Sequence, residues 1–499
     1  MKPVLSAEVL EEAQQMGLNP HRLSVHHRRI VAQLEAHQEE SVSFPMVVPC
    51  RLDNGRIFSL ETVAPAFSKT DLSHIVAMVL AAGASTRYFQ SYGDLQVALW
   101  TQDLLCLQKE AYRLLTADVA LTSPLRGALT DIVQEEVPSR QAMDNLQAAL
   151  SLPKALQAFS SSGTTFLAHK IEAHASFSFL QGQVFVIPPG FLQDFERAPP
   201  PVTSPPILWE TQDASLSTLR FDPKTGEPWR EARGALSPVP AGHGVLLEKF
   251  AAIRQRFAEV KSVWIHNIDN TATGDLSVAV PFLQTHEAVR ASMVQLRLYA
   301  VQGDFAAASA EAAALQARFP VRELASHEQA FVQNQDTEVQ ALWRFLFQVF
   351  QLPISIARSQ PLAVLLARPV NLLGVVRNLG TDIGGAPVVV RTPQGEVAVC
   401  LELPHIADES RADFSDPAQV THFNPVYLCA EWVDPRMYRG EEHPYWLLAR
   451  KTWQGHPVCY HETLLSELVG NAELANVIFL EVPRRIFCPH KAIEETKGK

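Results

Sequence analysis

Residues that could bind phosphate follow a short apolar segment near the N-terminus. The segment Ile75–Leu80 is typical of a buried strand, and the loop after it contains small residues before it reaches Arg87. Backbone N–H groups in such a loop can bind phosphate oxygens, and an arginine at its edge can neutralise their charge. The candidate residues are Ala81, Ala82, Gly83, Ala84, Ser85 and Arg87. The alternative is an ordinary turn between a strand and a helix.

Two further charged residues could act on the same phosphates. Lys154 follows a proline in L-P-K-A-L, where a stiffened loop can place a compact charge on a phosphate. Asp269 comes directly after V-W-I-H-N-I at 263–268, at the end of a predicted buried strand, where open α/β sheets bind ligands. Mg²⁺ commonly takes one or two carboxylates together with substrate phosphates. A surface lysine and a turn-capping aspartate are the alternatives.

Four other segments carry glycine, amide or lysine groups that could contact a ligand. In P-A-G-H-G-V, Gly242 and Gly244 flank His243 and would let a flat ligand approach the backbone, or His243 is a buried turn residue. Gly384 and Gly385 imply a close approach to a ligand or a hairpin. The last two segments offer the Asn424 amide and the Lys491 ammonium, and ordinary loop residues are the alternative for both.

The elements that must position these residues alternate between helices and strands. Helices are expected within residues 1–40, with Ser6 as a cap and Gly17 as a stop, and within 94–150 and 287–352. His26, His27 and His37 are expected to be solvated or capping residues. Strands are expected within residues 44–60, 75–80, 174–180, 183–189, 205–210, 263–268, 372–376, 387–390, 397–403, 420–429 and 476–482. This alternation predicts an α/β sheet interrupted by helical insertions.

Composition narrows the class of protein. The 499 residues are 47% hydrophobic and 19% charged, which is typical of a folded chain. The net charge of −11 argues against nucleic acid as a partner, and no apolar run approaches the length of a membrane span. The six cysteines lack C-x-x-C spacing, and the N-terminus lacks the features of a signal peptide. A cytoplasmic protein is expected.

Taken in order, the motifs resemble those of the UTP–glucose-1-phosphate uridylyltransferase superfamily, the UDP-sugar pyrophosphorylases, and most closely an uncharacterised bacterial branch of nucleotidyltransferase-like proteins. The family's L-A-G-G-x-G-T-R, P-K-G, P-G-H-G-D and N-x-D-N-L-G-A are similar to L-A-A-G-A-S-T-R, P-K-A, P-A-G-H-G-V and N-I-D-N-T-A-T here. Farther on, I-G-G, C-L-E-L-P-H, H-F-N-P-V-Y-L and E-V-P-R-R-I-F-C-P-H-K-A resemble the family's remaining motifs.

The resemblance implies a Rossmann-like nucleotidyltransferase fold of the GT-A type, a mixed sheet with helical insertions. It divides the chain into an N-terminal cap (1–70), a catalytic domain (71–430) with insertions near 94–150 and 287–352, and a C-terminal segment (431–499). The implied reaction joins a nucleoside triphosphate, UTP in the first place, to a sugar 1-phosphate and releases pyrophosphate with Mg²⁺. The partners are these two substrates.

Roles follow residue by residue from the resemblance. Arg87, Lys154 and Lys491 would stabilise the phosphates during catalysis, and Asp269 would bind Mg²⁺. The nucleotide would contact Ala81, Ala82, Gly83, Ala84, Ser85, Gln212, Gly242, His243 and Gly244. The sugar would contact Asn267, Gly384, Gly385, Glu402 and Asn424.

Four positions depart from the family's pattern. Ala82 and Ser85 stand where the family usually carries glycine, Val245 stands in place of its aspartate, and Ile383 in place of its lysine. Two alternatives therefore stay open. One is a protein that binds a nucleotide or sugar phosphate without turnover, and the other is an interaction protein that uses the helical insertions as a partner surface.

Overall fold

The computed structural model describes residues 5–35, 43–83, 88–198, 205–231, 234–380, 384–432, 445–453 and 455–496. The chain forms two compact units. The first unit comprises Met1–Val76, Gln212–Ile265 and Ser277–Arg484, and the second comprises Ala77–Thr211, His266–Leu276 and Arg485–Lys499. The three consecutive segments expected from the sequence stay a prediction.

The first unit contains most of the strands. A mixed sheet runs in the order β2 (Phe58–Ser59), β16 (Asn476–Glu481), β9 (Val370–Arg377), β13 (Tyr427–Glu431) and β8 (Ser262–Asn267), with β12 (His422–Phe423) beside β9. β16 pairs in parallel with β2 and β9, whereas β13 and β12 are antiparallel to β9. The smaller antiparallel sheets are β1 (Met46–Pro49), β10 (Ala386–Thr392) and β11 (Gly395–Leu401); β14 (Leu447–Trp453) and β15 (His456–Glu462); and β6 (Ser217–Leu219) and β7 (Pro238–Pro240).

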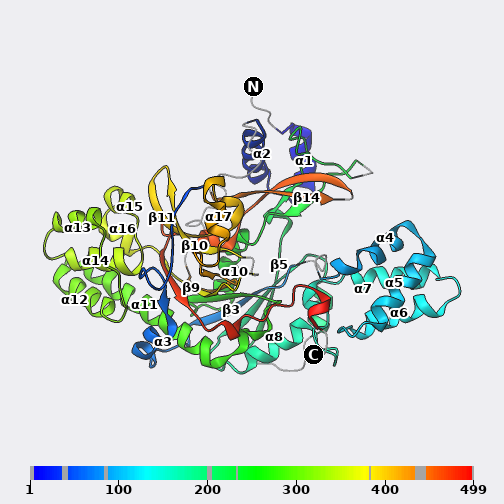
Figure 1. Ribbon diagram of the computed structural model, residues 1–499, viewed down its shortest axis with the longest axis horizontal. Helices are drawn as coiled ribbons and strands as arrows, with labels where there is room; N and C mark the ends of the chain where they lie inside the picture. Colours follow the sequence, from blue (N-terminus) through cyan, green and yellow to red (C-terminus); the bar gives the residue numbers. More distant parts are fainter. Residues whose placement is uncertain are drawn as a thin grey trace. The chain divides into compact units, whose positions relative to one another are not determined.

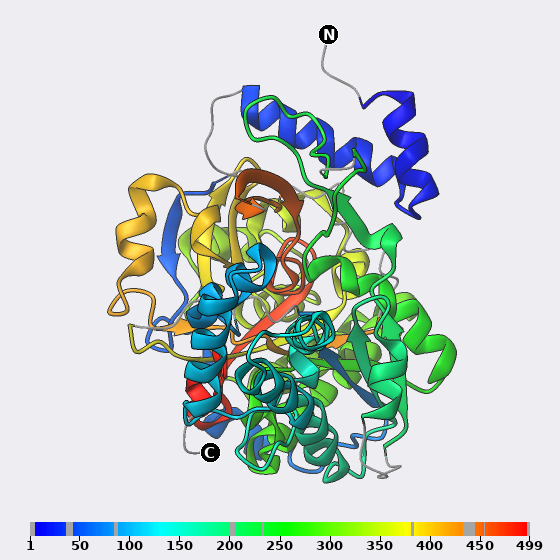
Figure 2. The same cartoon turned by 90° about the vertical axis from the view of Figure 1, so that its right-hand side faces the viewer.

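Helices of the first unit form two groups in the sequence. At the N-terminus, α1 (Ala7–Gln15) and α2 (Pro20–Glu35) lie side by side (Figure 2). The Ser6 side chain accepts the Val9 N–H at 3.3 Å, and Gly17 has a φ of +81°, which confirms the predicted cap and stop of α1. The second group comprises α11 (Leu276–Gln302), α12 (Phe305–Gln316), α13 (Ser326–Gln333), α14 (Gln340–Val349), α15 (Ile354–Ser359) and α16 (Leu362–Leu366). Shorter helices are α3 (Leu60–Val63), α10 (Phe250–Arg256), α17 (Asp408–Ser415) and α18 (Leu465–Val469).

The histidines of α2 are buried, so their expected solvation was wrong. His26 is 1% exposed and stacks on His461 of β15, with ring centroids 3.8 Å apart, and His461 in turn stacks on Trp446 at 4.8 Å. The His26 Nδ1 lies 2.9 Å from the Thr218 hydroxyl. The sequence placed these rings in a charged context, but the His26 ring is covered by His461 of β15 and the His27 ring by Phe221. His37 lies outside the described residues.

The second unit packs helices on a short sheet in the order β3 (Ile75–Leu80), β4 (Gly182–Ile187) and β5 (Ile207–Thr211), in which β4 and β5 are parallel. Each residue of β3 and β4 is buried. The helices are α4 (Gly93–Thr101), α5 (Leu104–Thr116), α6 (Ser123–Gln134), α7 (Arg140–Leu150), α8 (Phe166–Ala175) and α9 (Leu192–Arg197). In Figure 1, α4 to α7 form a bundle, which agrees with the helices expected within 94–150.

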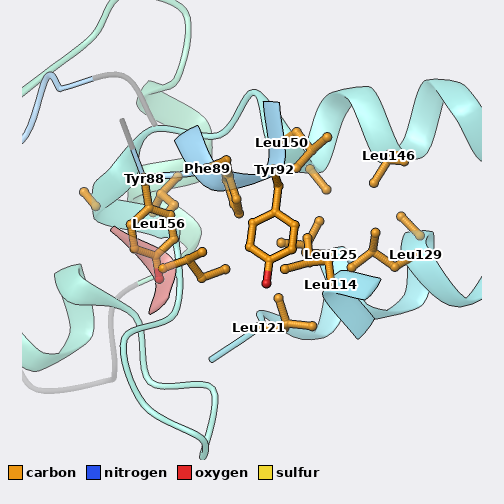
Figure 3. Packing of buried hydrophobic residues seen from close by; sticks show 14 of the residues in the cluster. Tyr88, Phe89, Tyr92, Leu114, Leu121, Leu125, Leu129, Leu146, Leu150 and Leu156 are labelled. Atoms are coloured by element: carbon orange, nitrogen blue, oxygen red, sulfur yellow. The ribbon is translucent and has the colours of Figure 1, made fainter. Parts of the chain in front are cut away.

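In the core of the second unit, this bundle packs against Tyr88, Phe89 and Tyr92. Tyr92 points toward Leu114, Leu121 and Leu125 of the bundle, while Tyr88 lies beside Leu156 (Figure 3). Tyr88 and its neighbours are almost completely buried. The residues Tyr88–Tyr92 are therefore fixed by packing on both sides.

One predicted strand was wrong. Residues 174–180 form the end of α8 and the turn after it. The Thr165 hydroxyl caps α8 by accepting the Ala168 N–H at 3.1 Å, and buried residues recur at the helical spacing up to His174. The helical spacing of the buried residues therefore determines the structure, although the aromatic residues of this segment favoured a strand. No helix among the described ranges is both long and apolar enough to cross a membrane.

Candidate functional site

The loop after β3 is described as far as Gly83. The Ala81 N–H donates to the Val186 carbonyl oxygen at 2.9 Å, so Ala81 still belongs to the sheet and is buried. Ala82 is half-buried and Gly83 is exposed, and a Cβ at Gly83 would meet no atom within 4 Å. Ala84, Ser85 and Arg87 lie outside the described residues, and their roles stay predictions.

Lys154 lies next to this loop. Its backbone N–H donates to the Gly83 carbonyl oxygen at 3.2 Å. Its side chain is 11% exposed, and its Nζ lies 3.3 Å from the Asp269 Oδ2. The ammonium also lies over the rings of Tyr88 and Phe166, at 5.6 and 5.5 Å from their centroids. Burial lowers the pKa of Lys154, and the Asp269 carboxylate acts in the opposite direction. Lys154 is therefore not a surface lysine.

Asp269 lies in the turn that follows β8. Its side chain is 23% exposed, so the carboxylate reaches solvent as well as Lys154. The capping role falls to the next residue, because the Asn270 Oδ1 accepts the Ala272 N–H at 3.4 Å at the start of the short 3₁₀ helix Thr271–Gly274. The Asp269 side chain is thus available for chemistry at the carboxyl end of a buried strand.

The C-terminal segment is attached to the same turn. Asn270 donates to the Ile486 carbonyl oxygen and accepts the Cys488 N–H, each at 2.9 Å, and the His490 N–H donates to the Asp269 carbonyl oxygen at 3.1 Å. Lys491 follows directly and is exposed, and its charge contributes to the lowered pKa of Lys154 after burial. Within the second unit, Lys154, Asp269 and Lys491 therefore lie in one neighbourhood.

Helix α8 adds basic residues that the sequence analysis missed. Lys170 is 1% exposed, and its Nζ donates to the Asn270 carbonyl oxygen at 2.6 Å and to the Thr273 hydroxyl at 2.5 Å. Burial lowers the pKa of Lys170 to about 7, with Asp269 acting in the opposite direction. The available signal was a lysine in the middle of the apolar stripe of a helix.

Beneath Lys170 lie two buried histidines. The Nε2 atoms of His174 and His266 are 3.0 Å apart, and the His174 Nδ1 lies 2.9 Å from the Gln183 Oε1. Burial, and after it the charge of Lys170, lowers the pKa of His174 to about 3. Both rings are therefore neutral at physiological pH.

The donor set fits Mg²⁺ in one specific way. Among the described ranges, no group of three or more His, Cys, Asp or Glu side chains is arranged to hold a metal ion. Asp269 could supply one partly solvated carboxylate oxygen, in which case most other ligands would come from phosphates and water, which is the usual mode for Mg²⁺.

The glycines predicted to line the nucleoside lie in the first unit and pack on protein. Gly242 has a φ of +89°, and a Cβ there would lie 2.7 Å from the Glu462 Cγ. A Cβ at Gly244 would lie 2.6 Å from the Thr463 Cγ2, and the Gly244 N–H donates to the Thr463 carbonyl oxygen at 2.8 Å. His243 is exposed, which excludes the buried-turn alternative, and Gln212 is buried. Close packing on Glu462 and Thr463 accounts for both glycines.

The residues predicted to contact the sugar also lie mainly in the first unit. Asn424 is 2% exposed, and its side-chain amide donates to the carbonyl oxygens of Gly374 and Tyr427 at 2.7 and 3.2 Å. A Cβ at Gly385 would lie 3.0 Å from the Cys400 Sγ, and one at Gly384 would lie 3.0 Å from the Phe423 ring. Both glycines and Asn424 therefore make internal contacts that explain their residue types.

Glu402 and Asn267 differ from this group because their side chains are partly exposed. The Glu402 N–H donates to the Glu467 carboxylate at 3.3 Å. Asn267 is the last residue of β8 and, unlike the start of that strand, belongs to the second unit. The sugar-binding roles of all five residues stay predictions.

The sequence matches a protein family, and the fold is similar to those of known proteins. The family model described as "Domain of unknown function (DUF4301)" matches residues 202–496. No curated protein matches the sequence. The solved structures that are similar include the UDP-glucose pyrophosphorylase of Leishmania major, with 13% identity over 98% of this chain and 77% of that chain and a TM-score of 0.48. Another is the UDP-glucose phosphorylase of Trypanosoma brucei, with 13% identity over 97% of this chain and 75% of that chain and a TM-score of 0.49. Because the family model spans more than half of the sequence, the chain belongs to the DUF4301 family.

Proposed function

We propose that this chain is a Mg²⁺-dependent nucleotidyltransferase that joins a nucleoside triphosphate, UTP in the first place, to a sugar 1-phosphate and releases pyrophosphate. The observation that carries the proposal is the ion pair between Lys154 and Asp269, whose Nζ and Oδ2 are 3.3 Å apart. The two residues belong to separate motifs that resemble P-K-G and N-x-D-N of the pyrophosphorylases. Their contact at the ends of β3 and β8 supports a shared role toward one phosphate chain.

The chemistry requires positioning and charge rather than proton transfer. An oxygen of the sugar phosphate attacks the α-phosphorus of the triphosphate in line, a new P–O bond forms, and the bond to the β-phosphate oxygen breaks with release of pyrophosphate. Mg²⁺ held at Asp269 would neutralise phosphate charge. Lys154, whose ammonium is largely shielded from water, would donate hydrogen bonds to the phosphates, where electrostatic stabilisation is strong. Lys491 would add a second positive charge at the exposed side.

The decisive experiment measures pyrophosphate release. Wild-type protein is incubated with each of the four nucleoside triphosphates and a panel of sugar 1-phosphates, with and without Mg²⁺. We expect release that needs all three components. Asp269→Asn should lower kcat/KM by about 10²-fold or more, because it removes the metal-binding charge. Asp144→Asn is the matched control, since Asp144 is a solvent-exposed aspartate on α7 in the same unit. Circular dichroism and the Tm verify folding of both variants.

One observation favours binding without turnover. Val245 occupies the position of the family's aspartate, and its side chain is buried, so no carboxylate is available there. Tight binding of Mg²⁺ and a triphosphate, without pyrophosphate release for any sugar phosphate, would support this second function and refute the first. Absence of both binding and release would refute both.

A further inference from the structure

The turn that carries Asp269 lies along one face of α8. His169 Nε2 is 2.8 Å from the Thr271 carbonyl oxygen, and Lys170 contacts Asn270 and Thr273. At the end of the turn, a Cβ on Gly274 would lie 2.8 Å from the Ala173 Cβ. Helix α8 therefore contacts successive residues of the turn and forms the surface on which the turn rests.

Lys170 differs from its neighbours on that face because it is charged. Its ammonium is completely enclosed, yet it lies in an apolar stripe with Phe166, Leu167 and Ile171. Burying an ammonium is costly, and an apolar side chain would fill the same space at lower cost. The lysine therefore has to provide something that an apolar side chain lacks. Its Nζ donates hydrogen bonds to two oxygens of the turn, the first of which is the carbonyl oxygen of the residue next to Asp269.

We propose that Lys170 is a positioning residue for Asp269: its buried ammonium fixes the turn at Asn270 and Thr273 and so holds the Asp269 carboxylate in the orientation that a phosphate-bound cation requires. The proposal rests on the proposed function for the role of Asp269. Lys170 itself touches neither cation nor substrate, since the turn lies between. Its action runs through the backbone of one adjacent residue.

The experiment is a double-mutant cycle read out by binding. The dissociation constant of UTP in the presence of Mg²⁺ is measured by calorimetry for wild type, Lys170→Met, Asp269→Asn and the double variant. We expect Lys170→Met to weaken binding by about tenfold in the wild-type background and to have no further effect when Asp269 is already replaced. A merely structural lysine would weaken binding equally in both backgrounds, and that additive result would overturn the proposal.

A second readout locates the effect. Hydrogen exchange should show faster exchange of the amides of residues 270–274 in Lys170→Met, with the rest of the second unit unchanged. Ile171→Val is the matched control, because it removes one methylene from a completely buried neighbour on α8 whose side chain cannot form a hydrogen bond to the turn. If Lys170→Met does not fold, Thr273→Val and Thr273→Ser replace it: the first removes the hydroxyl that Lys170 binds, and the second keeps it.

The outcomes separate the two proposals. If the wild-type protein binds no triphosphate, the proposed function is refuted. The role of Lys170 is then tested by hydrogen exchange of the turn amides alone. Faster exchange confined to the turn supports positioning. Equal exchange rates of these amides in Lys170→Met and Ile171→Val would overturn the positioning role. Equal exchange rates in Thr273→Val and Thr273→Ser would overturn it as well.

Discussion

Replacement of Lys154 by methionine should separate function from stability. Methionine has a similar length, so its side chain can occupy the space between Tyr88 and Phe166 and make sulfur–aromatic contacts there. The substitution removes the ammonium that lies 3.3 Å from the Asp269 carboxylate. We therefore expect a large effect on phosphate chemistry and a small one on the free energy of unfolding.

The size of the stability effect follows from two opposing contributions. At 3.3 Å and an effective dielectric constant of about 20, the attraction between Lys154 and Asp269 is about 5 kcal/mol. Transferring the ammonium from water to a site where it is only 11% exposed costs several kcal/mol. This cost offsets most of the attraction. Asp269 remains 23% exposed, so it can be solvated after the loss of its partner. The free energy of unfolding should change by no more than about 1.5 kcal/mol, in either direction.

The functional effect should be much larger. Loss of one preorganised donor to a developing negative charge typically lowers the rate by about 10²–10³-fold. The assay compares kcat/KM for pyrophosphate release, or triphosphate affinity, with urea unfolding of the same samples. Lys109→Met on the exposed face of α5 is the matched control. A loss of more than about 3 kcal/mol of stability in Lys154→Met would show that the pair is structural. An unchanged kcat/KM would show that Lys154 does not act on the phosphates.

Two further predictions concern the first unit. Burial raises the pKa of Glu287, but the charges of His286 and Arg290 outweigh burial and hold this pKa below its ordinary value. The stability that the carboxylate confers is therefore present above the ordinary pKa of a glutamate and is lost as the pH falls through the lowered pKa of the folded state. Urea unfolding should therefore show wild type losing its advantage over Glu287→Gln as the pH is lowered from about 6 to 3, and a constant difference would refute this account. Gly242→Ala should destabilise the chain by about 2–4 kcal/mol, because a positive φ is combined with a close approach to Glu462. Thermal unfolding checks this against Gly303→Ala, where φ is +73° with no atom within 4 Å, and equal Tm losses would contradict the packing argument.

The elements with strong local signals were predictable from the sequence. β3 occupies Ile75–Leu80 as expected, because an uninterrupted apolar run that ends in small residues has few other solutions. α1 begins after Ser6 because the hydroxyl accepts an N–H of the first turn. The hairpin of β14 and β15 was missed. Its strands carry Arg450, Lys451 and Pro457, and their buried residues are consecutive and do not alternate with exposed ones, so the period-2 pattern that marks a strand is missing.

The candidate site was predictable only in part, and the reason is the distance along the chain between contacting residues. The sequence showed Lys154 and Asp269 as separate candidates, and no local pattern could reveal that they form an ion pair across 115 positions. The predicted binding glycines pose a different problem, because the sequence shows that something approaches the backbone closely but does not show what it is. Gly242 has the same sequence signature whether a ligand or Thr463 approaches it, and only the fold identifies the neighbour. Lys170 escaped notice because a single lysine in a helix is usually a surface residue.

The geometry of the second unit gives these residues a common physical logic. The turn after β8 is held from one side by α8 through Lys170 and from the other by the C-terminal segment through Asn270 and Cys488. Both attachments use backbone oxygens or the Asn270 amide, and neither uses the Asp269 carboxylate. The carboxylate is thus rigidly placed while its own charge is balanced by Lys154 at 3.3 Å, a contact that a more highly charged phosphate chain can replace. Under the proposed function, a rigidly placed carboxylate and a lysine that can turn from it to a phosphate would suit transfer between two polyanions, because the groups that meet the substrates must be positioned before the charges arrive.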